Sequence, residues 1–193
     1  MAKTKARADL FDIVKTRLDG IRLLLDDMDE SAAGQFVQMV LHAGRIFVTG
    51  KGRSGFVAQC FATRLMQMGF DVHVPGEATC PRIKRGDLMV AISCSGTTGS
   101  TVQFARISGQ SGAKVAAVTA VADSPLTALA DHVVLVPVTG KEVKRHYRYV
   151  LGPHNNTLFE EALLLYFDAM VYSILERKGI SKKVLTDRHT NLE

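Results

Sequence analysis

The stretch that decides the fold is residues 88–100, which read LMVAISCSGTTGS. Its first five residues are apolar, and such a short continuous run is typical of a strand buried on both faces of a parallel sheet. The eight residues that follow include five serines or threonines, which is more hydroxyl groups than a turn needs. We expect a helix to begin at about residue 98. Hydroxyl groups and backbone N–H groups at the start of a helix suit a phosphate dianion.

The sequence therefore predicts a phosphate-binding loop, whose expected contact residues are Ser93, Ser95, Gly96, Thr97 and Thr98. An alternative is that Ser93 and Thr98 only cap the helix and shape the turn.

The same alternation of a short apolar run and a helical segment extends to both sides of this stretch. The predicted strands are at 46–48, 71–74, 88–92, 115–118 and 133–136, and the predicted helices between them are at 54–69, 98–111 and 124–130. Strands that alternate with helices form a parallel sheet covered on both faces. Ligands of such sheets bind beyond the carboxyl ends of the strands, where the strand order reverses.

Helices are expected before and after the sheet. Residues 5–27 carry apolar side chains at helical spacing, a second helix runs to about residue 43, and a last one spans 158–178. We expect the apolar face of the first helix to pack against the sheet domain or a second subunit; its members are Leu10, Val14, Leu18, Ile21 and Leu25. The whole chain, 1–193, is interpreted as one domain, with N-terminal helices at 5–43, a sheet core at 44–137 and a C-terminal helix and tail at 157–193.

A second glycine-rich loop lies at 50–55, with the sequence GKGRSG. It matches the GxGxxG fingerprint of dinucleotide-binding proteins, and Glu77 stands roughly where that fingerprint expects a ribose-binding acid. A dinucleotide-binding protein, however, seats its pyrophosphate in this first loop and has no need of the hydroxyl-rich one. We therefore favour a phosphorylated small molecule. Its other expected contacts are Gly52, Arg53 and Ser54, with Lys51 adding positive field.

Cysteine and histidine spacing argues against a metal site. The three cysteines (Cys60, Cys80 and Cys94) form no CxxC pair, and the six histidines are scattered without an HExxH motif. We expect neither a metal nor another cofactor.

The net charge of +5 is spread over several segments, and aromatic residues do not interleave with them. This pattern favours a solvated basic surface or an anionic small ligand over nucleic acid. Apolar runs are only a handful of residues long, so we expect no membrane span, and the basic N-terminus lacks the apolar stretch of a secretory signal. The expected location is the cytoplasm.

The pattern SxSGxT at 93–98 resembles the phosphate loop of the sugar isomerase (SIS) domain family. The loop at 50–55 and the segment 124–131 are similar to two further segments of that family, and the resemblance covers about residues 30–180. It implies an α/β, three-layer, flavodoxin-like fold with a five-stranded parallel sheet and flanking helices. It also implies a sugar phosphate as ligand and assembly into homodimers or homotetramers.

Within the family, the chain most resembles the 6-phospho-3-hexuloisomerases. The features that carry this resemblance are the loop at 50–55, Gly76-Glu77 followed by Pro81, Gly86-Asp87, Phe159-Glu160 and the tail at 188–193. What it implies is interconversion of D-arabino-hex-3-ulose 6-phosphate and D-fructose 6-phosphate through an enediol. An isomerase of the arabinose 5-phosphate type and a non-catalytic module that binds a sugar phosphate remain alternatives.

The chain departs from these isomerases in two places. Cys94 and Thr97 stand where the phosphate loop usually has glycine and glutamate, which could change substrate preference. The segment 141–156 is also unusually basic and polar, so that Arg145, His146 and Arg148 could reach an anionic substrate or simply belong to a solvated loop.

Moving a ketone from C3 to C2 requires a general base and a donor that stabilises the enediolate oxygens. Glu160 is the first candidate for the base, because Phe-Glu at the start of the last helix corresponds to a functional carboxylate in the family. The alternative is a capping box formed by Thr157 and Glu160; Glu161 should point elsewhere. His189 is the candidate acid or oxygen donor, and a tail that reaches a neighbouring subunit's site would explain a functional residue so near the end. Glu77 is either a second carboxylate or a turn residue.

Overall fold

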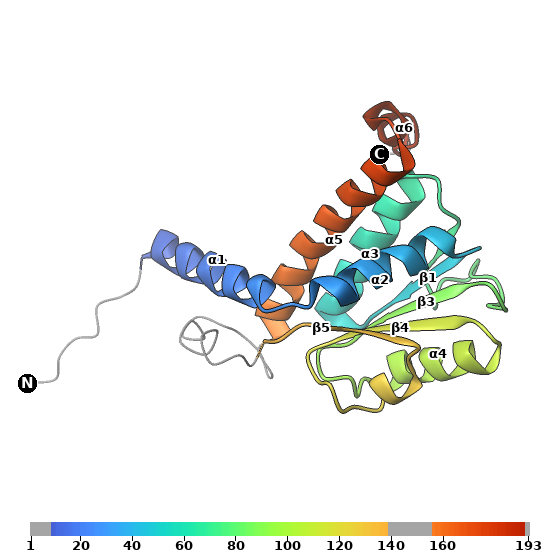
Figure 1. Cartoon of the computed structure of the whole chain (residues 1–193), viewed down its shortest axis with the longest axis horizontal. Coiled ribbons are helices and arrows are strands. Elements are labelled where there is room, and N and C mark those ends of the chain that lie inside the picture. The colour runs from blue at the N-terminus through green and yellow to red at the C-terminus, as the bar shows by residue number, and fades with distance from the viewer. Residues whose placement is uncertain (1–8, 139–155, 192–193) are drawn as a thin grey trace, which may run out of the picture.

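The computed structural model describes residues 9–138 and 156–191 of the 193-residue chain (Figure 1). Its centre is a five-stranded sheet in the order β2-β1-β3-β4-β5, and every neighbouring pair is parallel. The strands are β1 (Ile46–Thr49), β2 (Val72–His73), β3 (Leu88–Ile92), β4 (Lys114–Thr119) and β5 (His132–Leu135). The predicted five-stranded parallel sheet is confirmed, although β2 has only two residues instead of four.

Side chains alternate along the buried strands between two hydrophobic clusters, one on each face of the sheet. Ile46, Val48 and Val90 belong to the larger cluster, whereas Phe47 and Met89 belong to the smaller one. Each central strand is therefore apolar throughout, as expected for a doubly covered sheet.

Helices cover both faces and give the predicted three layers (Figure 1). The larger cluster lies between the sheet and a set of helices that includes α2 (Glu30–His42), α3 (Gly52–Gln67) and α5 (Asn156–Lys178). The smaller cluster lies under α4 (Gly99–Gln110). The rings of Phe61 on α3 and Phe167 on α5 stack with their centroids 4.3 Å apart. This contact joins the two helices side by side.

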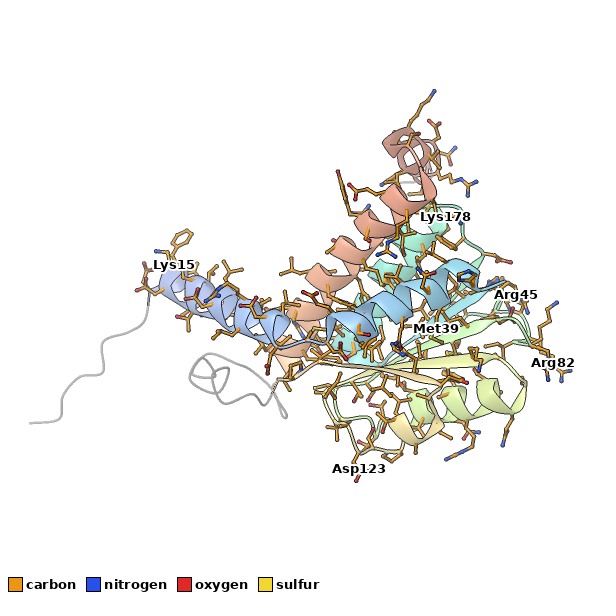
Figure 2. All side chains as sticks on the ribbon, in the orientation of Figure 1. Lys15, Met39, Arg45, Arg82, Asp123 and Lys178 are labelled. Atoms are coloured by element: carbon orange, nitrogen blue, oxygen red, sulfur yellow. The ribbon has the colours of Figure 1, made fainter. Side chains whose placement is uncertain are left out.

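Helix α1 (Leu10–Asp26) packs onto α5 through its C-terminal half, where Ile21 and Leu24 are buried. Its N-terminal half projects from the body of the molecule, at the position that Lys15 marks in Figure 2. The apolar side chains there are exposed; they are Leu10, Phe11, Val14 and Leu18. The packing against the sheet domain that we expected for this helix thus applies to its C-terminal half.

The predicted helix at 124–130 is wrong as an α-helix, because the segment forms only a short 3₁₀ turn, η1 (Thr127–Leu129). Reciprocal side-chain hydrogen bonds hold the start of this segment: the Ser124 N–H donates to Thr127 Oγ1 and the Thr127 N–H donates to Ser124 Oγ. The N–H of Leu126 donates to the carbonyl of Gly96 instead of to its own segment. The segment is therefore tied to the loop that follows β3.

The C-terminal region contains one helix that the sequence did not predict, α6 (Lys182–Asp187), directly after α5. Within the described ranges, none of the helices is long and apolar enough to cross a membrane.

Candidate active site

The candidate site lies at the carboxyl ends of β1 and β3, which are neighbours at the centre of the sheet. The chain leaves β1 toward β2 on one side and reaches β4 from β3 on the other, so the strand order reverses between them. This is the place where open parallel sheets bind ligands. The two loops singled out in the sequence, at 50–55 and 93–98, both begin at this edge.

The hydroxyl groups of the 93–98 loop form two pairs. Ser93 Oγ lies 2.9 Å from Thr98 Oγ1, and Ser95 Oγ lies 2.9 Å from Thr97 Oγ1. Ser93 is buried, whereas Thr97 is exposed and the other two are partly exposed. The hydroxyl groups of the loop thus range from buried, at Ser93, to exposed, at Thr97.

Thr98 occupies the N-cap of α4, but among the described residues its side chain makes no capping hydrogen bond. Its hydroxyl group is paired with Ser93 instead. The described part of the chain thus shows no helix cap by Thr98, whereas the other half of the alternative, that the two residues shape the turn, stands, because their bond spans the loop. The N–H groups of the first turn of a helix have no intrahelical partner. They are therefore available at the start of α4 to an anion, which the positive end of the helix dipole also attracts.

Gly96 is required by the shape of this loop. Its φ is +66°, in the left-handed region that favours glycine. A β-carbon at this position would lie 2.2 Å from Ser124 Oγ and 2.5 Å from Ser124 Cβ. The close approach of the 124–130 segment therefore fixes the loop in a conformation that no other residue type adopts without strain.

The 50–55 loop is equally compact. A β-carbon on Gly50 would lie 2.7 Å from the carbonyl oxygen of Ser54, and Gly52, which opens α3, has a φ of +58°. This turn brings Arg53 and Ser54, in the first turn of α3, to the start of α5.

Glu160 stands in the first turns of α5, and its side chain is only 6% exposed. Arg53 Nε donates to Glu160 Oε2 in an ion pair, and Ser54 Oγ lies 3.5 Å from Glu160 Oε1. The structure therefore brings together two residues expected to contact substrate and the residue expected to be the base.

Cys94, in the 93–98 loop, is influenced by the charge of Glu160. Burial of its thiol and, second, the negative charge of Glu160 raise the pKa of Cys94 to about 12. A thiol with this pKa stays protonated and unreactive near neutral pH. It contributes a small apolar surface to the buried part of the loop.

The capping-box alternative for Glu160 is wrong in this structure. Helix α5 begins at Asn156, so Thr157 already lies inside the helix, and the Glu160 carboxylate bonds to Arg53 and Ser54. Glu161 points to another side of α5, as expected, where it forms an ion pair with Arg17 of α1.

His189 lies far from Glu160 within the same chain. It follows α6, beyond the end of α5, and between Glu160 and Lys178 that helix rises by roughly 27 Å. Arg188, its neighbour, lies beside Gly69 at the C-terminal end of α3, whereas Arg53 is at the N-terminal end. Figure 2 shows Lys178 at the end of α5 that adjoins α6. The structure does not bring His189 into its own chain's candidate site.

Glu77 forms part of a turn after β2, in which its N–H donates to Val74 O and its carbonyl accepts from Cys80 N. Its side chain is exposed, and its charge adds to burial in raising the pKa of Cys80. Of the two interpretations of Glu77, a second carboxylate or a turn residue, the backbone hydrogen bonds agree with the turn residue. Arg145, His146 and Arg148 lie outside the described residues.

Sequence reasoning missed the pairing of Arg53 with Glu160, because the two residues are 107 positions apart and no local pattern links them. It also missed the position of Cys94 beside Glu160. In the described part of the chain, no group of three or more His, Cys, Asp or Glu side chains is placed to hold a metal ion.

Comparison with known proteins agrees with this geometry. The profile of the SIS domain family matches residues 39–150, which is more than half of the chain. The chain belongs to the SIS domain family. The described parts of the molecule accordingly show the flavodoxin-like five-stranded parallel sheet expected for that family.

Among SIS domain relatives, the 3-hexulose-6-phosphate isomerase of Mycobacterium gastri is 36% identical, over 91% of this chain and 90% of its own length. The enzyme of the same name from Bacillus subtilis is 34% identical, over 88% of this chain and 95% of its own. A crystal structure from Methanococcus jannaschii, with an inferred function of 3-hexulose-6-phosphate isomerase, superposes with a TM-score of 0.79. That protein is 28% identical and covers 95% of this chain and 98% of its own.

Proposed function

We propose that this chain is a phosphosugar isomerase that interconverts D-arabino-hex-3-ulose 6-phosphate and D-fructose 6-phosphate. The observation that carries the proposal is the buried carboxylate of Glu160 next to a phosphate loop, in a chain whose relatives of that name match it over about nine-tenths of its length. A carboxylate near a bound sugar phosphate supplies the general base that moving a proton between two carbons of the sugar requires.

In the proposed reaction, the hydroxyl groups at 93–98 and the first N–H groups of α4 bind the phosphate. Glu160 removes the proton from C2, and the electron pair forms the double bond of a 2,3-enediol as the C3 carbonyl oxygen takes a proton from the acid, for which His189 is the candidate. Return of a proton to C3 and loss of the O2 proton then leave the ketone at C2. The reaction therefore needs neither an oxidant nor a reductant. Ser54, which lies beside Glu160, and Gly52, which opens α3, are the proposed contacts of substrate oxygens.

His189 enters this proposal as the acid or oxygen donor of a neighbouring subunit's site. The distance along α5 supports this assignment, because His189 lies at the end of the helix opposite to Glu160. We accordingly propose a homo-oligomer, a dimer or a tetramer. The four exposed apolar side chains on the projecting half of α1 support it, since surfaces of this kind mark protein interfaces. The proposed location is the cytoplasm.

The test is a coupled assay that supplies D-arabino-hex-3-ulose 6-phosphate and detects D-fructose 6-phosphate. We expect turnover that persists after dialysis against a chelator and without nicotinamide in the reaction itself, because a ketone shift is redox-neutral. Activity that only a divalent cation restores would contradict the enediol scheme as drawn. Conversion of arabinose 5-phosphate, but not of the hexulose phosphate, would replace the proposed substrate.

A further inference from the structure

The ion pair between Arg53 and Glu160 joins two side chains of very different exposure. Arg53 is 62% exposed, whereas Glu160 is 6% exposed. The pair uses Arg53 Nε, and within the described residues no partner is recorded for the two terminal nitrogens of that guanidinium. Arg53 therefore covers the carboxylate from the solvent side and still presents donors outward.

The ion pair with Arg53 hinders Glu160 from acting as a general base. The Oε2 atom of Glu160 accepts the hydrogen bond from Arg53, so a lone pair of this oxygen is occupied and the exposed guanidinium lies over the buried carboxylate. A base that removes a carbon-bound proton needs an oxygen atom with an open lone pair and a high proton affinity. The carboxylate as it stands is shielded.

The surroundings allow Arg53 to move. Its side chain borders an open cavity of about 200 Å³ that is also lined by Phe56, Cys60 and Leu164. An exposed arginine gives up little when it leaves an ion pair, because water solvates it, but a buried carboxylate that loses its partner stays unsolvated. Departure of Arg53 would thus activate Glu160 as a base.

We propose that Arg53 is a substrate-responsive positioning residue: it shields Glu160 in the unliganded protein, and an anionic oxygen of the bound sugar phosphate draws the guanidinium away and releases the base. The inference rests on the proposed function and deepens it, because it makes the base strong only when substrate is present. The other titratable groups that face Glu160 are the Cys94 thiol after β3 and the adjacent Glu161, whose charge Arg17 of α1 neutralises.

The pH dependence of turnover tests this proposal. The kcat/KM profile reports the unliganded protein and the kcat profile reports the complex. In the parent protein, the acid limb of kcat should lie at higher pH than that of kcat/KM. Arg53→Gln should move the acid limb of kcat/KM upward, since the cation that favours ionised Glu160 is gone, and leave that of kcat in place.

Arg53→Gln should also raise KM by about tenfold, because one charge-assisted contact to substrate is lost. Arg53→Lys, which keeps the charge, should recover part of both effects. The matched control is Arg64→Gln, which removes another arginine of α3 that pairs with a carboxylate of α5, Asp168, and should leave both profiles unchanged. The ionisation of the substrate phosphate is common to all variants. Acid limbs of kcat and kcat/KM that move together, or not at all, in Arg53→Gln would overturn the proposal.

A second measurement needs no turnover. The ¹³C signal of the Glu160 carboxyl group, assigned by its loss in Glu160→Gln, is titrated in the parent protein with and without saturating D-fructose 6-phosphate. We expect the ligand to move the titration midpoint to higher pH. D-fructose 6-phosphate that binds without moving it overturns the role of Arg53 and leaves the proposed function standing. Failure of that ligand to bind overturns the proposed function, and the role of Arg53 with it.

Discussion

Substitution of Glu160 by glutamine separates catalysis from stability at the candidate site. The side-chain amide has nearly the shape of the carboxylate and can still accept from Ser54, but it cannot take a proton from C2. Loss of a general base typically lowers kcat by about 10²–10⁴-fold. We expect a decrease of this size for Glu160→Gln, with KM changed much less.

The structure indicates that this change costs little stability. The lost ion pair has one partner that is 62% exposed, so its contribution is reduced by solvent screening to about 1 kcal/mol or less. For a chain of this length, 1 kcal/mol corresponds to a shift in Tm of about 2–4 °C. Since Glu160 does not cap α5, no loss of a helix cap adds to this figure.

Three measurements check the prediction: initial rates in the coupled assay, thermal melts, and deuterium incorporation from the solvent into the product of the parent protein. The control is Glu161→Gln, which removes the neighbouring carboxylate and its ion pair with Arg17. The control should keep near-parental turnover. If Glu160→Gln turns over normally while the parent incorporates solvent deuterium, Glu160 is not the base, and Glu77 or His189 would be examined in its place.

Two predictions concern the phosphate loop and one concerns assembly. Thr98→Ala should raise KM by about tenfold in initial-rate measurements, since a charge-assisted hydrogen bond contributes ~1.5–3 kcal/mol; a normal KM would place the phosphate elsewhere. Gly96→Ala should lower Tm by about 4 °C or more, because a positive φ costs ~1–2 kcal/mol and the new β-carbon meets Ser124. Gly99→Ala, whose β-carbon meets nothing within 4 Å, is its control, and equal melts would refute the argument. Light scattering should show a dimer or tetramer, and a monomer at micromolar concentration would also remove the proposed role of His189.

The sequence by itself determined the elements of the sheet and the hydroxyl-rich loop at 93–98. Both are encoded locally: a doubly buried strand requires a continuous apolar run such as 88–92, and the loop after it shows its hydroxyl groups in consecutive positions. One failure followed from the start of the next strand. The helix expected at 124–130 is only a 3₁₀ turn, because the chain is already extended at Ala130 and the Asp131 N–H donates to Val115 of β4.

The tertiary structure alone decided how the candidate catalytic groups meet. Arg53 and Glu160 come together because α3 and α5 pack side by side over one face of the sheet, through contacts such as that of Phe61 with Phe167. The same packing separates His189 from Glu160 by the length of α5. A capping box and an ion pair compete for one carboxylate, and the sequence shows only the first of them. Burial next to a distant arginine determined the outcome, because an ion pair depends on distances in space rather than on spacing along the chain.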